Sequence, residues 1–312
     1  MMKKLWFAAI AALALVGCNE KVVEQNETQG GEKVQLTVNL SEGVTKVTGA
    51  IDDAKVNNLQ IFVFDKYGVY ETSSNGSGSS LSLTCTSGEK QIVALANAPI
   101  ETGVTDINVL RSRISDLKDC AVGSIVMAGE VSKTLTASST VTIQVERLAA
   151  RIALTKINLA FEQEQHRQLP FKVKAVYLIN VAGDRAYLST NTPSVWYNKA
   201  KYIAATSPSF LYDVVTSGDV SSGGSYTKGH YFYCYPNNTA TKTRLVVESE
   251  IGGNTYYYPI TLDTVDPNTA YTYNLTITRL GSDSPDMPVE EGAIKFTVTV
   301  KDWVEQDINE TI

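Results

Sequence analysis

The chain has 312 residues and a formal net charge of -6, and 43% of its residues are hydrophobic. A chain of this length and apolar content holds enough core material for two folded domains. Its acidic balance, without clusters of Lys or Arg, argues against a nucleic-acid partner, because such binding depends on neutralising phosphates.

Residues 1–17 have the features of a secretory signal peptide. Lys3 and Lys4 precede an apolar run over residues 5–16, which is too short to cross a bilayer as a mature helix. The run ends in Leu15-Val16-Gly17-Cys18, which resembles the lipobox of bacterial lipoproteins. We therefore predict that acyl chains such as palmitate on Cys18 anchor a precursor to the outer membrane. The alternative is an ordinary signal peptide with an incidental cysteine.

The remaining cysteines, Cys85, Cys120 and Cys234, are odd in number, so they cannot all pair within the chain. We expect buried free thiols, although one disulfide stays open for an exported protein. His166 and His230 each lack a second histidine or a carboxylate at ligand spacing. We predict no metal, no cofactor and no enzymatic activity, with a glycosidase-like carboxylate pair as a minor alternative.

Residues 18–32 are polar and carry too little apolar surface to fold, so we interpret them as a flexible tether. The stretch 33–46 that follows is predicted to be a strand and a turn. Apolar and polar residues alternate in it, so one face of the strand is apolar and the other is wet. The apolar residues are Val34, Leu36, Val38 and Leu40. Such a strand suits a half-buried position in a sheet.

The rest of the first domain, to residue 147, is predicted to consist of short strands and one short helix. The strands are expected at residues 59–65, 81–85, 91–98 and 141–145 and around Val126 and Leu135. The helix is expected to begin with a cap at Thr105 or Asp106 and to bury Ile107, Leu110 and Ile114.

Residues 148–312 are predicted to form the second domain. Short strands bounded by Pro, Gly or Asn recur in it, a pattern typical of β-sandwiches. They are expected at residues 148–154, 171–181, 186–188, 231–235, 244–249, 254–261 and 271–279. Fourteen of the sixteen tyrosines lie beyond residue 170. We interpret these as sheet cover rather than as a platform for sugars.

The end of the chain repeats the alternation of the first strand. Phe296, Val298 and Val300 alternate with threonines, and apolar residues continue at Trp303 and Ile308. Two segments thus fit one kind of groove. We interpret the first as filling that groove until the chain is cut between Lys46 and Val47, after which residues 293–312 of another copy replace it. The alternative is that residues 293–312 are simply the last strands of their own domain.

Several stretches, taken in order, resemble the fimbrillins, the subunits of protease-assembled pili of anaerobic diderm bacteria. Together with the lipobox, the matching stretches are residues 59–65, 93–99, 147–157, 175–181, 231–238, 256–260 and 295–303. The resemblance implies two transthyretin-like β-sandwich domains and export as a surface lipoprotein. It also implies removal of the first strand by an Arg- or Lys-specific protease. Lys46 stands here where many relatives have Arg.

We therefore predict a structural subunit of a fimbrium, a pilin that contributes to adhesion. Its partners would be other copies of itself, accessory pilins, the maturation protease and an unidentified surface receptor. It would pass from the outer membrane to the extracellular fimbrium, as a shaft, tip or anchor subunit. The alternative function is a glycan-binding surface lipoprotein that uses exposed aromatics at Tyr256 to Tyr258 and Trp196. Asp263-Thr264-Val265 also resembles a short O-glycosylation acceptor motif.

Overall fold

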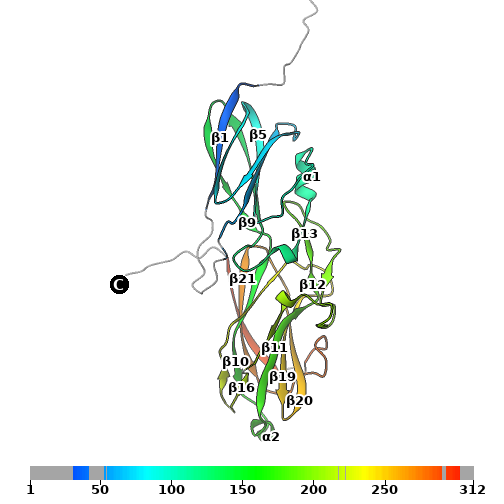
Figure 1. The fold of residues 1–312 in the computed structure, drawn as a ribbon. Coiled ribbons are helices and arrows are strands. Elements are labelled where there is room, and N and C mark those ends of the chain that lie inside the picture. The colour runs from blue at the N-terminus through cyan, green and yellow to red at the C-terminus, as the bar shows by residue number, and fades with distance from the viewer. Residues whose placement is uncertain are drawn as a thin grey trace, which may run out of the picture.

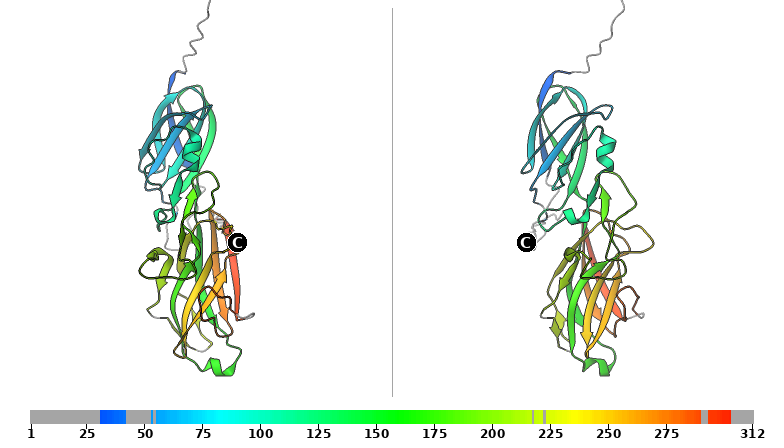
Figure 2. Two further views of the ribbon diagram at one scale, coloured as in Figure 1. Left: turned by 90° about the vertical axis from the view of Figure 1, so that its right-hand side faces the viewer. Right: turned by 45° about the vertical axis from the view of Figure 1, so that its right-hand side comes forward.

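The computed structural model describes residues 31–41, 53, 55–216, 218–221, 223–289 and 293–302, without the side chains of residues 301 and 302. Two β-sandwiches lie end to end in an elongated molecule (Figure 1, Figure 2). The expectation of an all-β fold is confirmed. We call the two parts the N-terminal sandwich, which holds β1 to β9, and the C-terminal sandwich, which holds β10 to β22.

The N-terminal sandwich packs a three-stranded sheet on a five-stranded one. The first sheet has the order β4 (Ser80–Thr86), β1 (Lys33–Ser41) and β8 (Ser139–Gln144). The second has the order β3 (Tyr70–Gly76), β2 (Leu59–Asp65), β5 (Gly88–Ala96), β7 (Met127–Leu135) and β9 (Glu146–Arg147). A core of buried side chains from both sheets fills the space between them.

The helix α1 (Ile107–Ser112) packs on the outer face of the five-stranded sheet. Asp106 caps it, accepting hydrogen bonds from the backbone N–H groups of Asn108 and Val109, as the sequence predicted. Ile107 and Leu110 are buried, but the prediction for Ile114 is wrong. The backbone turns extended at Arg113, and Ile114, 47% exposed, begins β6 (Ile114–Asp116), which pairs with β13 (Asp184–Ala186).

The C-terminal sandwich also has two sheets. One centres on β10 (Ala150–Leu159) and has the order β17 (Ser225–Tyr226), β10, β21 (Thr269–Ile277) and β22 (Ile294–Asp302), with β18 (His230–Cys234) also on β10. The other has the order β15 (Tyr212–Val214), β11 (Phe171–Ile179), β19 (Arg244–Ile251) and β20 (Asn254–Thr261), with β16 (Asp219–Val220) also on β11.

Smaller elements complete the fold. They are a pair of short strands, β12 (Val181–Ala182) and β14 (Trp196–Tyr197), a second helix, α2 (Glu164–Arg167), and 3-10 turns at Leu117–Asp119 and Ser209–Leu211. The expectation of only one short helix is therefore corrected. The helix α2 is a single turn with no buried residue, so no apolar periodicity marks it in the sequence.

A buried histidine links the edges of the two C-terminal sheets. His230 on β18 has no exposed surface. Its Nδ1 lies 2.5 Å from a carboxylate oxygen of Asp213 on β15, and its Nε2 lies 2.8 Å from the hydroxyl of Tyr226 on β17. Burial lowers the pKa of His230, opposed by Asp213 and reinforced by Lys228. The sequence did not predict this carboxylate partner, because it is brought close only by folding.

We expect the His230 imidazole to make stability depend on pH. Its pKa lies below the 6.5 of an unfolded histidine, so the unfolded chain takes up this proton first as the pH falls. The free energy of unfolding should therefore fall as the pH drops below about 6.5, the pKa of the unfolded histidine, and His230→Gln should remove that slope. Urea denaturation at several pH values measures it. The control variant His166→Gln leaves the buried His230 imidazole in place and should keep the slope. An unchanged slope in His230→Gln would refute the assignment of the pH dependence to His230.

Candidate functional site

Strand β1 fills a groove between two strands that come much later in the chain. It pairs antiparallel with β4 along residues 33–39 and parallel with β8 along residues 36–41. The inward side chains are almost fully buried, with exposed fractions of 7%, 0%, 0% and 9% for Val34, Leu36, Val38 and Leu40. They join the core between the two N-terminal sheets. The alternation predicted for this strand therefore corresponds to its buried face.

The outward face of β1 carries a row of polar side chains that face β4. The hydroxyl oxygens of Thr37 and Ser82 lie 2.8 Å apart, and Ser80 donates to the side chain of Asn39 over 2.6 Å. A third contact joins Thr84 to Gln35 over 3.3 Å. We call these three pairs the polar ladder. Together with the four buried side chains, the ladder specifies the register of β1.

Strand β22 presents the opposite situation, because it lies at a sheet edge with its apolar residues uncovered. It pairs antiparallel with β21, its only partner strand among the described residues. Phe296, Val298 and Val300 are 50%, 41% and 55% exposed. The Phe296 ring lies 6.1 Å from that of Tyr273, between centroids. In the described part of the chain β22 is an edge strand of its own sandwich, and it offers a row of exposed apolar side chains.

The other predicted site residues lie outside the described part of the chain. These are the signal peptide, the lipidation residue Cys18, the cleavage site at Lys46 and Val47, and the last two donor residues Trp303 and Ile308. The cleavage site falls between the end of β1 and Asp53.

Asp53, which ends this interval, is held at the junction of the two sandwiches. It is 4% exposed. Its side chain accepts a hydrogen bond from the Tyr233 hydroxyl at 2.5 Å and pairs with Arg151 at 3.3 Å. Its carbonyl oxygen accepts from Arg147 at 3.2 Å. Burial raises the pKa of Asp53, while Tyr233 and the two guanidinium groups oppose that rise. No sequence spacing indicates this cluster, because Asp53, the two arginines and Tyr233 come from three distant parts of the chain.

The aromatic residues considered for sugar binding do not form one exposed platform. Tyr258 is fully buried, and its hydroxyl donates to the carbonyl of Arg279 at 2.9 Å, so its expected exposure is wrong. Tyr256 and Tyr257 are half-buried neighbours on one strand, so they face opposite sides of the sheet. Trp196 is half-buried and packs against the core.

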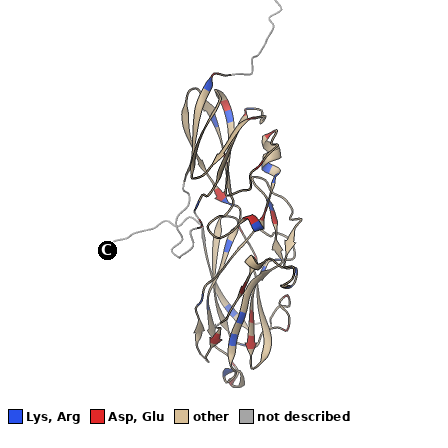
Figure 3. Cartoon of the chain, viewed as in Figure 1, with Lys and Arg blue, Asp and Glu red and all other residues tan. Residues whose placement is uncertain are grey.

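The described cysteines are buried, and the described charged residues are dispersed. Cys85, Cys120 and Cys234 are buried free thiols, as expected, and burial raises the pKa of Cys120 to about 11. The described residues contain no group of three or more His, Cys, Asp or Glu side chains suited to a metal ion. Figure 3 shows basic and acidic residues interspersed along both sandwiches.

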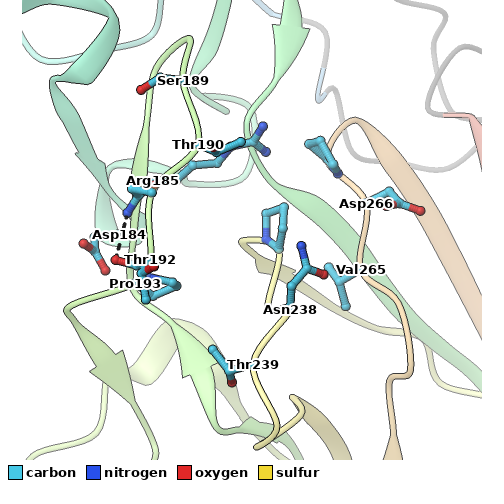
Figure 4. A pocket seen from close by; sticks show the side chains of 13 residues that line it. Asp184, Arg185, Ser189, Thr190, Thr192, Pro193, Asn238, Thr239, Val265 and Asp266 are labelled. Carbon is cyan, nitrogen blue, oxygen red and sulfur yellow. Dashed lines mark hydrogen bonds between the residues drawn. The ribbon is translucent and has the colours of Figure 1, made fainter.

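A polar cavity of about 340 Å³ lies near the junction, between loops of the C-terminal sandwich (Figure 4). Its charged side chains are already engaged in structural contacts. The carboxylate of Asp184 accepts hydrogen bonds from Ser194 and Val195, and Arg185 donates to the carbonyl of Leu148 at 2.6 Å. We therefore regard the groove under β1 and the exposed row on β22 as the candidate site.

None of the helices in the described part of the chain has the length and apolar character needed to span a bilayer.

Comparison with known proteins places this chain among fimbrial proteins. Residues 33–160 match the family of the major fimbrial subunit protein FimA, and residues 126–303 match the fimbrillin-like family. The type-2 major fimbrium subunit FimA of Porphyromonas gingivalis is 21% identical, with 96% of this chain and 97% of that protein aligned.

Solved structures share the fold. A fimbrilin from Porphyromonas gingivalis W83 superposes with a TM-score of 0.67 at 16% identity, covering 86% of this chain and 97% of that one. The tip fimbrial protein Mfa3 of Porphyromonas gingivalis gives 0.55 at 14% identity, covering 87% and 100%. Both families are families of structural subunits rather than of enzymes. The chain therefore belongs to the fimbrillin-like family of fimbrial subunits.

Proposed function

We propose that this chain is a pilin that polymerises by exchanging strands between copies. In this proposal it is exported as a lipoprotein acylated on Cys18, cut after Lys46, and built into an extracellular fimbrium that serves adhesion. Strand β22 of one copy then replaces β1 of the next. The observation that carries the proposal is the pair of matching strands, one buried in a groove and one exposed at an edge.

Leaving the groove empty would cost considerable free energy. Each of the four inward side chains of β1 contributes roughly 1.5–3 kcal/mol when fully buried. Removing the strand also uncovers the backbone hydrogen-bonding groups of β4 and β8, which pair with it along most of its length. A strand from another molecule restores both the apolar contacts and the hydrogen bonds. Filling the groove is therefore a strong driving force for association.

The positions of groove and donor favour a chain of subunits over a closed pair. The groove lies in the N-terminal sandwich, whereas β22 lies in the C-terminal sandwich (Figure 1). A contact between two different surfaces of the same protein is heterologous and propagates unless its rotation closes a ring. The elongated shape of the subunit suits a fibre built in this way.

The Asp53 cluster supports a cut that frees β1 alone. Lys46 precedes Asp53 by seven residues, and Asp53 is held by Arg147, Arg151 and Tyr233 at the sandwich junction. A break after Lys46 would leave the new N-terminus tethered there. Only the segment that carries β1 would lose its covalent link to the folded subunit.

Processing at Lys46 should control assembly. Limited trypsin treatment of the folded protein should yield ladders that resist SDS, and Lys46→Gln should abolish them, because β1 then stays attached. The matched control is Lys33→Gln at the exposed start of β1. A cut at Lys33 leaves the four buried side chains in place, so this variant should assemble normally. Equal ladders from Lys46→Gln and the unaltered protein would contradict the proposed cleavage site.

A charge in the donor row should block assembly without unfolding the subunit. Val298 is 41% exposed in the monomer, so Val298→Asp should change its free energy of unfolding by only about 0.5 kcal/mol. In the groove the same carboxylate would be buried without a partner, and fibres should be lost. The control Thr299→Asp alters an exposed residue of opposite parity and should assemble. Electron microscopy of the trypsin-processed protein shows whether fibres form. Normal fibres from Val298→Asp would refute the donor role of β22.

A further inference from the structure

The apolar and polar positions of β22 match those of β1 one by one. Residues 34–41 are Val-Gln-Leu-Thr-Val-Asn-Leu-Ser, and residues 294–301 are Ile-Lys-Phe-Thr-Val-Thr-Val-Lys. In this alignment four apolar residues match the four buried side chains of β1, and the central Thr-Val pair is identical. The alternation alone allows several registers and both strand directions.

We propose that β22 of a second copy enters the groove in the direction that β1 has, with Thr297 beside Ser82. This inference rests on the proposed function, which requires strand exchange but does not specify direction or register. Ile294, Phe296, Val298 and Val300 then take the sites of Val34, Leu36, Val38 and Leu40, in that order.

The sizes of the central side chains favour this direction. Leu36 and Val38 are both fully buried, so their sites are the least tolerant of a change in volume. In the proposed direction Phe296 takes the larger site, that of Leu36. Val298 takes the smaller site, that of Val38, with an identical side chain. In the reverse direction Val298 would leave a void at Leu36, and Phe296 would overfill the site of Val38. The remaining mismatches fall at the ends, where Val34 and Leu40 are slightly exposed.

Polarity, charge and side-chain size exclude the neighbouring registers of β22 in the groove. A slip by one residue would turn the lysine and threonine side chains of β22 into the core. A slip by two residues one way would place an aspartate, residue 302, at the nearly buried site of Leu40. A slip by two the other way would place Gly292 at the site of Val34, which leaves part of the groove empty.

The polar ladder provides a way to read register and direction separately. Thr37 faces Ser82 at the middle of β1, and Thr297 would face Ser82 in either direction. Thr299 distinguishes the two directions. In the proposed direction it takes the place of Asn39 opposite Ser80, and in the reverse direction it takes the place of Gln35 opposite Thr84.

Paired cysteines test the inference in assembled fibres. Residues directly opposite in an antiparallel pair have Cα atoms about 4.5–5.5 Å apart, which is within disulfide reach. Under mild oxidation, Ser82→Cys with Thr297→Cys and Ser80→Cys with Thr299→Cys should give covalent ladders on heated non-reducing gels. Thr84→Cys with Thr299→Cys should give none. Each single variant serves as a control for the native thiols, which are buried in the subunit.

The outcomes separate the two proposals. A ladder from the Thr84 and Thr299 pair would overturn the direction and leave strand exchange standing. Fibres in which none of the three pairs cross-links would overturn both the register and exchange into this groove.

If a double variant fails to assemble, a synthetic peptide of residues 293–302 carrying Thr299→Cys is added to trypsin-processed subunits. Mass spectrometry then shows which site the peptide reaches. A peptide bonded to Ser80→Cys subunits supports the inference, whereas bonding to Thr84→Cys subunits, or to neither, overturns it.

Discussion

The buried face of β1 is the interaction on which the rest of this structure depends. Four alternate side chains of one short strand complete the core between the two N-terminal sheets. The strands beside β1, β4 and β8, come from later parts of the chain and form no hairpin with it. Hence β1 completes this core without being a hairpin partner of either strand that flanks it.

The exposed apolar row on β22 is to be considered together with the groove that holds β1. Natural proteins usually shorten, twist, charge or cover an edge strand, because an exposed edge pairs readily with other chains. Here the edge strand is nine residues long and presents Phe296, Val298 and Val300 to solvent. One sandwich thus contains a strand whose apolar face is buried, and the other contains an uncovered strand of the same pattern. Membership of the fimbrillin-like family relates these two matching strands to fimbriae.

The parts of the fold that period-two alternation controls could be predicted from the sequence. The buried face of β1 and the parity of β22 follow from alternation, since successive side chains of a strand point to opposite sides. The cap at Asp106 was also predictable, because its signal is local. The end of α1 was not, because Ile114 leaves the helix to pair with β13, a tertiary constraint.

Contacts between distant residues account for the other differences. His230 meets Asp213 only when the two C-terminal sheets close on each other, and no sequence spacing indicates that meeting. Tyr258 belongs to the buried core, although the glycan-binding alternative counted it as exposed. Whether β22 stays on β21 or moves to another copy is likewise absent from the pattern, because one alternation fits both positions.

The central claim is that β1 is absent from the mature fibre and that another copy fills its place. The most direct measurement is mass spectrometry of the protein in fibres sheared from cells. The account predicts a mature N-terminus at Val47 and no peptide from residues 33–46. Fibres whose subunits keep the segment from Val34 to Leu40 would contradict it.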